Sequence, residues 1–507
     1  MLAVAIGFVI TCSVLGSAAL DYWVQLLIHL VLMLALIFWV WTTPFSTIVS
    51  APKNKRPFVL WSVVLLLLFL SLKYSGDPLK SLEAYWIWID CALLYFFASH
   101  LTKTQTDRLD QYLFVPWGIL IVGAFIEWSR SSGHPPQVTL LNSNALAAYL
   151  IIPVCLGLEK MSLIAKPSPL TVIYTALSLL CMLTTRSVGA CIALLGALSF
   201  IVHTDPRLPK RLKQTGAILL PVLTFSFLII KLAFSWDTHR WLLWKSAAQM
   251  IADRPLWGFG ARSFEMGLHQ RLDLNQYSIF THNTYLQWGV ENGLLALGGL
   301  LLLIGYSLSK QKNTYRAAAC LGLMIHNLYD FSLILPSHAF LFWFLLGWKD
   351  PSDDPRHPPT KTDFKMAFLA TAIFLGAAIV QINHFLAQRA FSKGSYALER
   401  ADLSTSRNCA NQGLQKEPLS ADGYFLLSRA ASLESSLKPS NALLCQSLSY
   451  ALMSVDQEPV QTTFWVKALQ VYNTLGLHAD EQALKSRLFQ TYPHLRNDKR
   501  FLRESNS

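Results

Sequence analysis

Apolar residues in this chain are gathered into long blocks and are not spread in the stripes of soluble helices or strands. They make up 53% of the 507 residues, whereas charged residues make up only 14%. Because a helix needs about 20 apolar residues to cross a bilayer, we interpret apolar blocks of roughly 15 to 25 residues as spans. The pattern predicts an all-α, polytopic membrane bundle of about 12 to 13 transmembrane helices. The expected segments are 2–20, 23–41, 58–73, 84–99, 112–128, 140–158, 169–184, 187–203, 214–235, 285–309, 314–330, 333–348 and 365–386.

The basic residues indicate how this bundle is oriented. The formal net charge is +12, and with a cytoplasmic N-terminus most of the Lys and Arg residues fall on cytoplasmic connections. Cytoplasmic loops of membrane proteins carry an excess of these residues. The basic charge therefore reflects topology and gives no reason to expect nucleic-acid binding. The short loops on the opposite side carry only Lys73, Lys80, Arg130 and Arg186.

This topology divides the chain into a membrane domain, residues 1–386, and a non-cytoplasmic tail, residues 387–507, with a loop at 236–284 on the same side as the tail. In the tail, Glu417-Pro418 recurs as Glu458-Pro459, each pair followed by an apolar cluster. An interval of about forty residues is typical of stacked antiparallel helix pairs. We therefore expect a tetratricopeptide-like helical domain in preference to an unrelated helical bundle.

The cysteines predict little chemistry. Six of the eight fall in the expected spans and are interpreted as packing residues. Cys409 and Cys445 lie in the tail, where an oxidising compartment would permit a disulfide, the alternative being two free thiols. Because no Cys-x-x-Cys pair, His-Glu-x-x-His helix or carboxylate cluster is present, the sequence predicts no metal site and no cofactor.

A histidine precedes one of the longest apolar blocks. His282 lies in a polar loop that leads into the apolar run 294–306. Histidine is one of the few side chains that can accept or donate a proton near neutral pH, and this placement would bring it to the head group of a lipid-borne substrate. Asn283 or Thr281 would cap the following helix, whose positive N-terminal end would favour an anion nearby. His282 is therefore the candidate catalytic residue.

Two arginines could hold such an anion. Arg186 lies between two spans, next to the small residues Ser187 and Gly189. It is either a snorkelling arginine at the interface or a phosphate-binding group in a pocket lined by protein. Arg240 begins the segment 240–250, which we expect to form an amphipathic helix lying on the membrane. The apolar positions expected to share one face of that helix are Trp241, Leu243, Trp244 and Met250.

Other polar residues are candidates for a supporting role. Glu291 lies nine residues after His282, a separation of about 180° around a helix and about 13 Å along it. The two cannot share one helical face, so we expect Glu291 to anchor another helix or an arginine. His326 is favoured as an interior polar residue, whereas Asp330 would pair with an arginine of the loop or orient His282. Arg262 is a further candidate. Gly258-x-Gly260 is expected to form a turn, because no Lys-Ser/Thr pair follows it.

Four motifs follow one another along the chain. They are Leu141-Asn142-Ser143-Asn144-Ala145-Leu146-Ala147, Arg186-Ser187-x-Gly189-Ala190, Arg240-x-x-x-Trp244 with Pro255-x-x-Gly258-x-Gly260-x-x-x-Phe264, and His282-Asn283-x-x-Leu286 with Glu291-x-Gly293. In this order and within the expected topology, they resemble the O-antigen ligase and polymerase superfamily over about residues 115–350. The sequence departs from the family pattern at Asn292, where an apolar residue is common.

The resemblance implies a bacterial inner-membrane transferase that takes a glycan from undecaprenyl diphosphate at the periplasmic face. His282 would correspond to the family's loop histidine, and Arg186 and Arg240 to arginines that engage the diphosphate. We expect an inverting, metal-independent O-antigen ligase with lipid A-core as acceptor. Alternatives are a protein O-oligosaccharyltransferase, a polysaccharide polymerase with a glycan acceptor and, outside the enzymes, a transporter or flippase.

Overall fold

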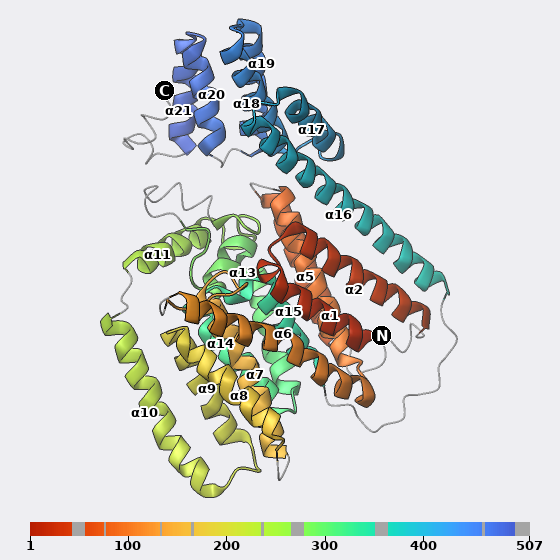
Figure 1. The fold of residues 1–507 in the computed structure, drawn as a ribbon, viewed down its shortest axis with the longest axis vertical. Coiled ribbons are helices and arrows are strands. Elements are labelled where there is room, and N and C mark those ends of the chain that lie inside the picture. The colour runs from red at the N-terminus through yellow and green to blue at the C-terminus, as the bar shows by residue number, and fades with distance from the viewer. Residues whose placement is uncertain are drawn as a thin grey trace.

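The structure is a computed structural model that describes residues 1–42, 56–75, 78–131, 134–163, 167–234, 238–264, 278–349, 364–458 and 462–491. Within these ranges it contains helices and no strand, which confirms the all-α prediction (Figure 1). The membrane part consists of α1 (Leu2–Leu15), α2 (Tyr22–Thr42), α4 (Arg56–Ser71), α5 (Pro78–Ser99), α6 (Lys103–Arg130), α7 (Ser143–Leu163), α8 (Pro169–Thr184), α9 (Val188–Thr204), α10 (Lys210–Phe234), α11 (Thr238–Asp253), α13 (Thr284–Lys310), α14 (Thr314–His326), α15 (Pro336–Gly347) and α16 (Phe364–Glu399).

Every predicted span overlaps a helix, and eight of the described helices are long and apolar enough to cross a membrane: α2, α4, α5, α6, α7, α10, α13 and α16. Helices α1, α8, α9 and α15 are apolar but shorter. Several helices begin before the apolar run that predicted them, because polar residues build their first turns. Helix α6, expected from residue 112, begins at Lys103 behind a capping box of Thr102 and Gln105.

The outer surface of the bundle suits a bilayer better than water. Ile218 and Phe225 on α10 are 72% and 63% exposed, and Phe368 on α16 is 69% exposed. Apolar side chains exposed in continuous rows are expected where lipid is the solvent. The interior is formed by α7, whose residues 145–152 are fully buried, and by α15, all of whose residues are buried. The chain is therefore a multi-pass membrane protein.

Helix α13 is broken near its beginning. Gly293 has φ 77° and ψ 168°, a conformation open essentially to glycine alone. The segment 255–260 satisfies the backbone groups on both sides of the break. Phe259 and Gly260 donate their N–H groups to the carbonyls of Val290 and Glu291 at 2.9 and 2.8 Å, and the N–H of Leu294 reaches the carbonyl of residue 255 at 2.7 Å. The turn expected at Gly258-x-Gly260 is present, and its hydrogen bonds also stabilise the break in α13.

Beyond the bundle, the chain folds into a series of stacked helices. Helix α16 runs from Phe364 to Glu399 without a break, so the predicted boundary between residues 386 and 387 falls inside it. Then follow α17 (Leu403–Lys416), α18 (Ala421–Leu437), α19 (Asn441–Gln457), α20 (Thr462–Thr474) and α21 (His478–Thr491), which pack in chain order (Figure 1). We call α17–α21 the helical domain. Cys409 is buried and Cys445 is exposed, and both are free thiols, which excludes a disulfide between them here.

Candidate functional site

The loop that carries His282 is held against a second loop at one end of the bundle. The N–H of Thr284 donates to the carbonyls of Asn327 and Asp330, both at 3.1 Å, and its hydroxyl donates to Oδ1 of Asn327 at 2.6 Å. Nδ2 of Asn283 donates to the carbonyl of Leu328 at 3.1 Å. These contacts, made by side chains and backbone groups, join the segments 278–284 and 326–332, and we call the two segments together the His282 cluster.

His282 lies half-buried at the start of α13, in a left-handed backbone conformation with φ 54°. Its ring packs edge-on against Phe331, with centroids 5.0 Å apart, and Phe331 is stacked on Phe280 at 4.0 Å. The next residue, Asn283, is the N-cap of α13, as predicted, and accepts hydrogen bonds from the N–H groups of residues 285 and 286. The imidazole therefore lies beside the positive end of a capped helix.

Arg240 reaches the His282 cluster from α11. Its Nη1 donates to the carbonyl of Tyr329 at 2.7 Å. The predicted arrangement of α11 is wrong in one respect: Leu243 and Met250 are fully buried against α13, whereas Trp241 is 57% exposed. Residues 241 and 243 lie two positions apart, about 200° around a helix, so they cannot share one face. Packing on α13 through Leu243 and Met250 directs Arg240 toward Tyr329.

Arg186 lies at the same end of the bundle. It occupies the exposed turn between α8 and α9, with φ 58°, and Ser187 caps α9. At the other end of α9, Asp205 accepts a hydrogen bond from the Tyr315 hydroxyl at 2.8 Å, so the start of α14 lies beside the end of α9. The end of α14, at His326, therefore lies toward Arg186. The backbone N–H of Arg186 donates to the carbonyl of Leu183 at 3.1 Å, whereas its guanidinium forms no hydrogen bond or ion pair among the described residues.

The supporting candidates divide into two groups. His326 and Asp330 are buried in the His282 cluster: His326 Nδ1 lies 3.3 Å from the hydroxyl of Ser332, and Asp330 accepts from the N–H of Phe331 at 2.7 Å. Within the described residues, Asp330 forms no ion pair. Glu291 lies deeper in α13, away from His282.

A short chain of hydrogen bonds nevertheless connects Glu291 to the histidine loop. Gln287 donates from Nε2 to Glu291 at 2.6 Å, and its Oε1 accepts the N–H of Thr281 at 2.8 Å. Gln287 and Glu291 are four residues apart, which places them on one helical face. His282 and Glu291 are therefore separate, but a single glutamine lies between the loop of one and the carboxyl group of the other.

A cavity of about 370 Å³ opens beside Glu291, a size within the usual range for ligand sites. Its walls are mainly apolar and include Trp88 and Trp288, packed edge to face at 5.6 Å. Phe280 also lines it, so the Phe280–Phe331 stack separates the cavity from the ring of His282. The polar part of the wall contains Lys80, Arg262, Gln287, Glu291, Asn292 and Glu458.

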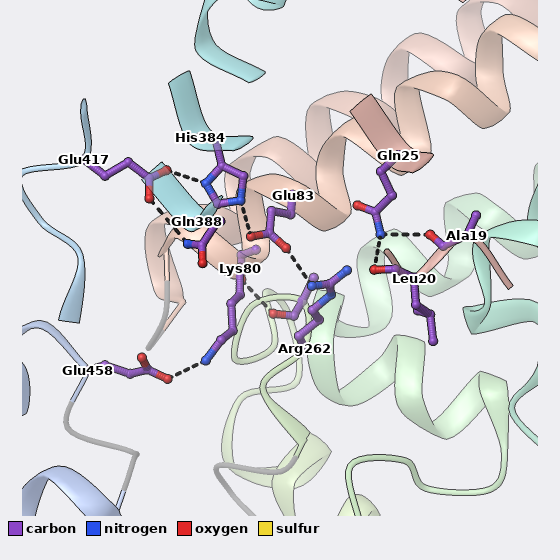
Figure 2. A network of polar contacts seen from close by, with 12 residues as sticks. Ala19, Leu20, Gln25, Lys80, Glu83, Arg262, His384, Gln388, Glu417 and Glu458 are labelled. Atoms are coloured by element: carbon purple, nitrogen blue, oxygen red, sulfur yellow. Dashed lines mark hydrogen bonds and ion pairs between the residues drawn. The ribbon is translucent and has the colours of Figure 1, made fainter. Parts of the chain in front are cut away.

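The two cations of the cavity wall belong to a network of ion pairs (Figure 2). Arg262 donates from Nη1 to Glu83 at 2.7 Å, and Nε2 of His384 lies 2.8 Å from the other oxygen of Glu83. Nδ1 of His384 pairs with Glu417 of the helical domain. Each nitrogen of this ring faces a carboxylate, an arrangement that favours the imidazolium form.

Lys80 forms the second connection, donating to Glu458 of the helical domain at 2.6 Å. Sequence reasoning assigned no site role to Lys80, Glu83 or His384, nor to Glu417 or Glu458. Two signals were available: Lys80 is one of four cations on the outer short loops, and both tail glutamates belong to the recurring Glu-Pro pairs. Pro459, in the second pair, lies outside the described residues.

The described residues contain no group of three or more His, Cys, Asp or Glu side chains placed to hold a metal ion. In the network around His384, the two carboxylates face opposite nitrogens of the ring and do not converge on one point. The cationic side chains of the cavity wall are Lys80 from α5 and Arg262 from the 255–264 segment, and the wall also contains the carboxyl groups of Glu291 and Glu458.

Comparison with known families identifies one part of the chain. Residues 173–301 match the family model described as O-antigen ligase. That stretch contains Arg186, Arg240, Arg262, His282 and Glu291. No curated protein matches the chain. The chain thus carries an O-antigen ligase family domain at residues 173–301, in a multi-pass membrane protein, and the family implies a ligase or transferase that uses a lipid-linked glycan donor and a glycan acceptor.

Proposed function

We propose that the protein transfers a glycan from undecaprenyl diphosphate to a hydroxyl of lipid A-core, acting as an O-antigen ligase. One observation supports this most: His282 and Arg240 both contact the 326–332 loop at one end of a membrane bundle, within the matched family domain. A proton acceptor and a cation at the same membrane face suit a reaction between two amphiphiles whose head groups lie at that face.

The chemistry assigned to these residues is a single displacement. His282 accepts the proton of the acceptor hydroxyl while the hydroxyl oxygen forms a bond to the anomeric carbon of the donor glycan. The bond from that carbon to the diphosphate breaks, and the leaving diphosphate takes the electron pair. Arg240 and Arg186 stabilise the negative charge that develops on it. Attack opposite the leaving group inverts the anomeric configuration, and the arginines supply the positive charge that a metal ion would otherwise provide.

The proposed orientation follows from the basic residues. With a cytoplasmic N-terminus, the positive-inside rule puts the His282 cluster, the cavity and the helical domain on the periplasmic side of a bacterial inner membrane. Asn283 and Glu291 would then support His282 through the cap and through Gln287. Arg262, His326 and Asp330 would support the surrounding walls.

Two alternative enzymes share this chemistry and differ in their acceptor. A protein O-oligosaccharyltransferase is favoured by the helical domain, because stacked helix pairs present extended surfaces to protein partners. A polysaccharide polymerase would use another glycan as acceptor. A transporter would be expected to have helices broken at the middle of the membrane. The break in α13 lies within its first ten residues and is bound by the 255–260 segment.

The test is the envelope glycan of a strain that carries His282→Ala. A ligase defect leaves full-length lipid-linked glycan and bare core, a polymerase defect leaves single repeats, and a protein transferase defect changes only the mass of a glycoprotein. His203→Ala is the matched control, because His203 is exposed at the other end of α9 and bonds only to its own helix. Normal glycans in a strain that produces the His282→Ala protein at the usual level would contradict the assignment.

A further inference from the structure

The two glutamates that join the helical domain to the membrane bundle occupy equivalent positions in its repeat. Glu417 ends α17 and Glu458 ends α19, with φ/ψ of −131°/80° and −138°/75°. The N–H of each donates at 2.9 Å to the carbonyl four residues earlier. Each lies in the turn between the two helices of a pair, so both pairs present a carboxylate at the same kind of corner.

Both carboxylates are directed at the membrane bundle (Figure 2). Glu458 accepts from Nζ of Lys80, a residue of the first turn of α5. Glu417 pairs with His384 on α16, and Nε2 of Gln388 lies 3.5 Å from its other oxygen. The Glu417 contact joins consecutive helices, whereas the Glu458 contact joins the domain to α5, 378 residues away. The domain is therefore attached to the bundle through Lys80 as well as through α16.

Both attachments end at the cavity. Lys80 lines the cavity directly, as does Glu458 itself. From Glu417 the connection passes through His384 and Glu83 to Arg262, which also lines the cavity. The two cations in the cavity wall are thus each held by a carboxylate, and each of these ion-pair connections leads to the helical domain.

In each of these ion pairs, the carboxylate side chain is more deeply buried than the cationic side chain. The side chains of Glu83 and Glu458 are 7% and 11% exposed, whereas those of Arg262 and Lys80 are 33% and 36% exposed. A buried carboxylate with a hydrogen-bonded cation has little freedom to move. Part of each cationic side chain stays exposed although its charge is paired. The buried carboxylate therefore fixes the position of that exposed part.

We propose that the helical domain completes the cavity, and that Glu458 and Glu417 are positioning residues that hold Lys80 and Arg262 in its wall for the anionic head group of a lipid-linked substrate. The nature of this ligand rests on the function proposed above. A phosphate-bearing head group on an apolar chain matches the exposed surface of two cations in a mainly apolar, aromatic wall, which also contains Glu291 and Glu458. It could come from the glycan donor or from a phosphorylated lipid acceptor.

The test measures equilibrium binding to the purified full-length chain in detergent. The probes are a polyprenyl diphosphate that carries one sugar and a phosphorylated glucosamine disaccharide lipid, assayed separately to distinguish donor from acceptor. Glu458→Gln and Glu417→Gln should each weaken binding of one probe by about tenfold, the effect expected from misplacing one charge-assisted hydrogen-bond donor. The isosteric change keeps the fold intact while removing the charge.

Two matched controls remove acidic groups of the helical domain that do not reach the cavity. Asp456→Asn breaks an exposed pair with Arg487, and Glu434→Gln breaks a pair with Arg407 within the domain. Both should leave binding unchanged. Lys80→Glu should also weaken binding, and adding Glu458→Lys should recover much of it, because both positions line the cavity and the exchanged pair keeps an ammonium in its wall.

Each outcome decides the proposal. Weaker binding of either probe in both glutamate variants, with normal controls, supports it even if His282→Ala transfers glycan normally, a result that would count only against the proposed reaction. Unchanged binding in the glutamate variants overturns it even if the chain is an active ligase. Failure of the wild-type chain to bind either probe overturns it as well.

Discussion

The His282 cluster and the cavity lie side by side but are built in different ways. The cluster joins the loop before α13 to the loop after α14, mostly through hydrogen bonds to backbone groups such as those of Thr284. The cavity draws its charged wall from α5, from the 255–264 segment and from the helical domain, joined by ion pairs between side chains. The difference teaches that the histidine is placed by contacts within the membrane bundle, whereas the cavity also depends on how the helical domain docks on that bundle.

Apart from changes at His282 itself, the largest loss of glycan transfer is expected from replacing the arginines near the His282 cluster. Arg240→Ala should lower glycan transfer by about 100-fold, the loss typical of removing one donor to a developing anion. Arg186→Ala should also lower transfer. Both proteins should insert into the membrane normally, and the measurement is the initial transfer rate per inserted protein. Full activity in both variants would exclude the proposed role in binding the diphosphate.

A smaller effect is expected at the break in α13, which joins the two regions. At Gly293 an alanine side chain would clash with the carbonyl of Leu256 in a backbone conformation that costs non-glycine residues of order 1–3 kcal/mol. Gly293→Ala should therefore lower both the melting temperature and the transfer rate. Gly298→Ala is the matched control in the same helix, because a methyl group there meets nothing within 4 Å. A Gly293→Ala protein with the melting temperature of the Gly298→Ala protein would contradict the strain expected for a non-glycine residue at position 293.

The smallest effect should follow from removing metal ions. If the arginines carry the charge of the leaving group, a chelator such as EDTA should change the transfer rate by less than about twofold. Re-adding Mg²⁺ or Mn²⁺ to the treated protein is the control. A large loss that divalent ions restore would assign the charge stabilisation to a metal and remove the need for Arg186 and Arg240 in that role.

The sequence predicted the cluster better than the cavity for a physical reason. Apolar blocks specify membrane helices directly, and the cap at Asn283 and the separation of His282 from Glu291 follow from helical geometry. The ion pair of Lys80 with Glu458 joins residues 378 positions apart, and that of His384 with Glu417 depends on how α16 packs on α17. No periodicity encodes such contacts. The prediction of which side chains share one face of α11 was wrong for a similar reason. The packing of α11 on α13 determines which of these side chains are buried.

The most direct test of the central claim is transfer by the purified chain in liposomes that contain a lipid-linked glycan donor and a lipid A-core acceptor. The wild-type protein should form the glycan–acceptor product. His282→Ala should lower the rate by about 100-fold or more, as expected when a general base is lost, while binding the donor with unchanged affinity. Transfer by His282→Ala at the wild-type rate would contradict the account.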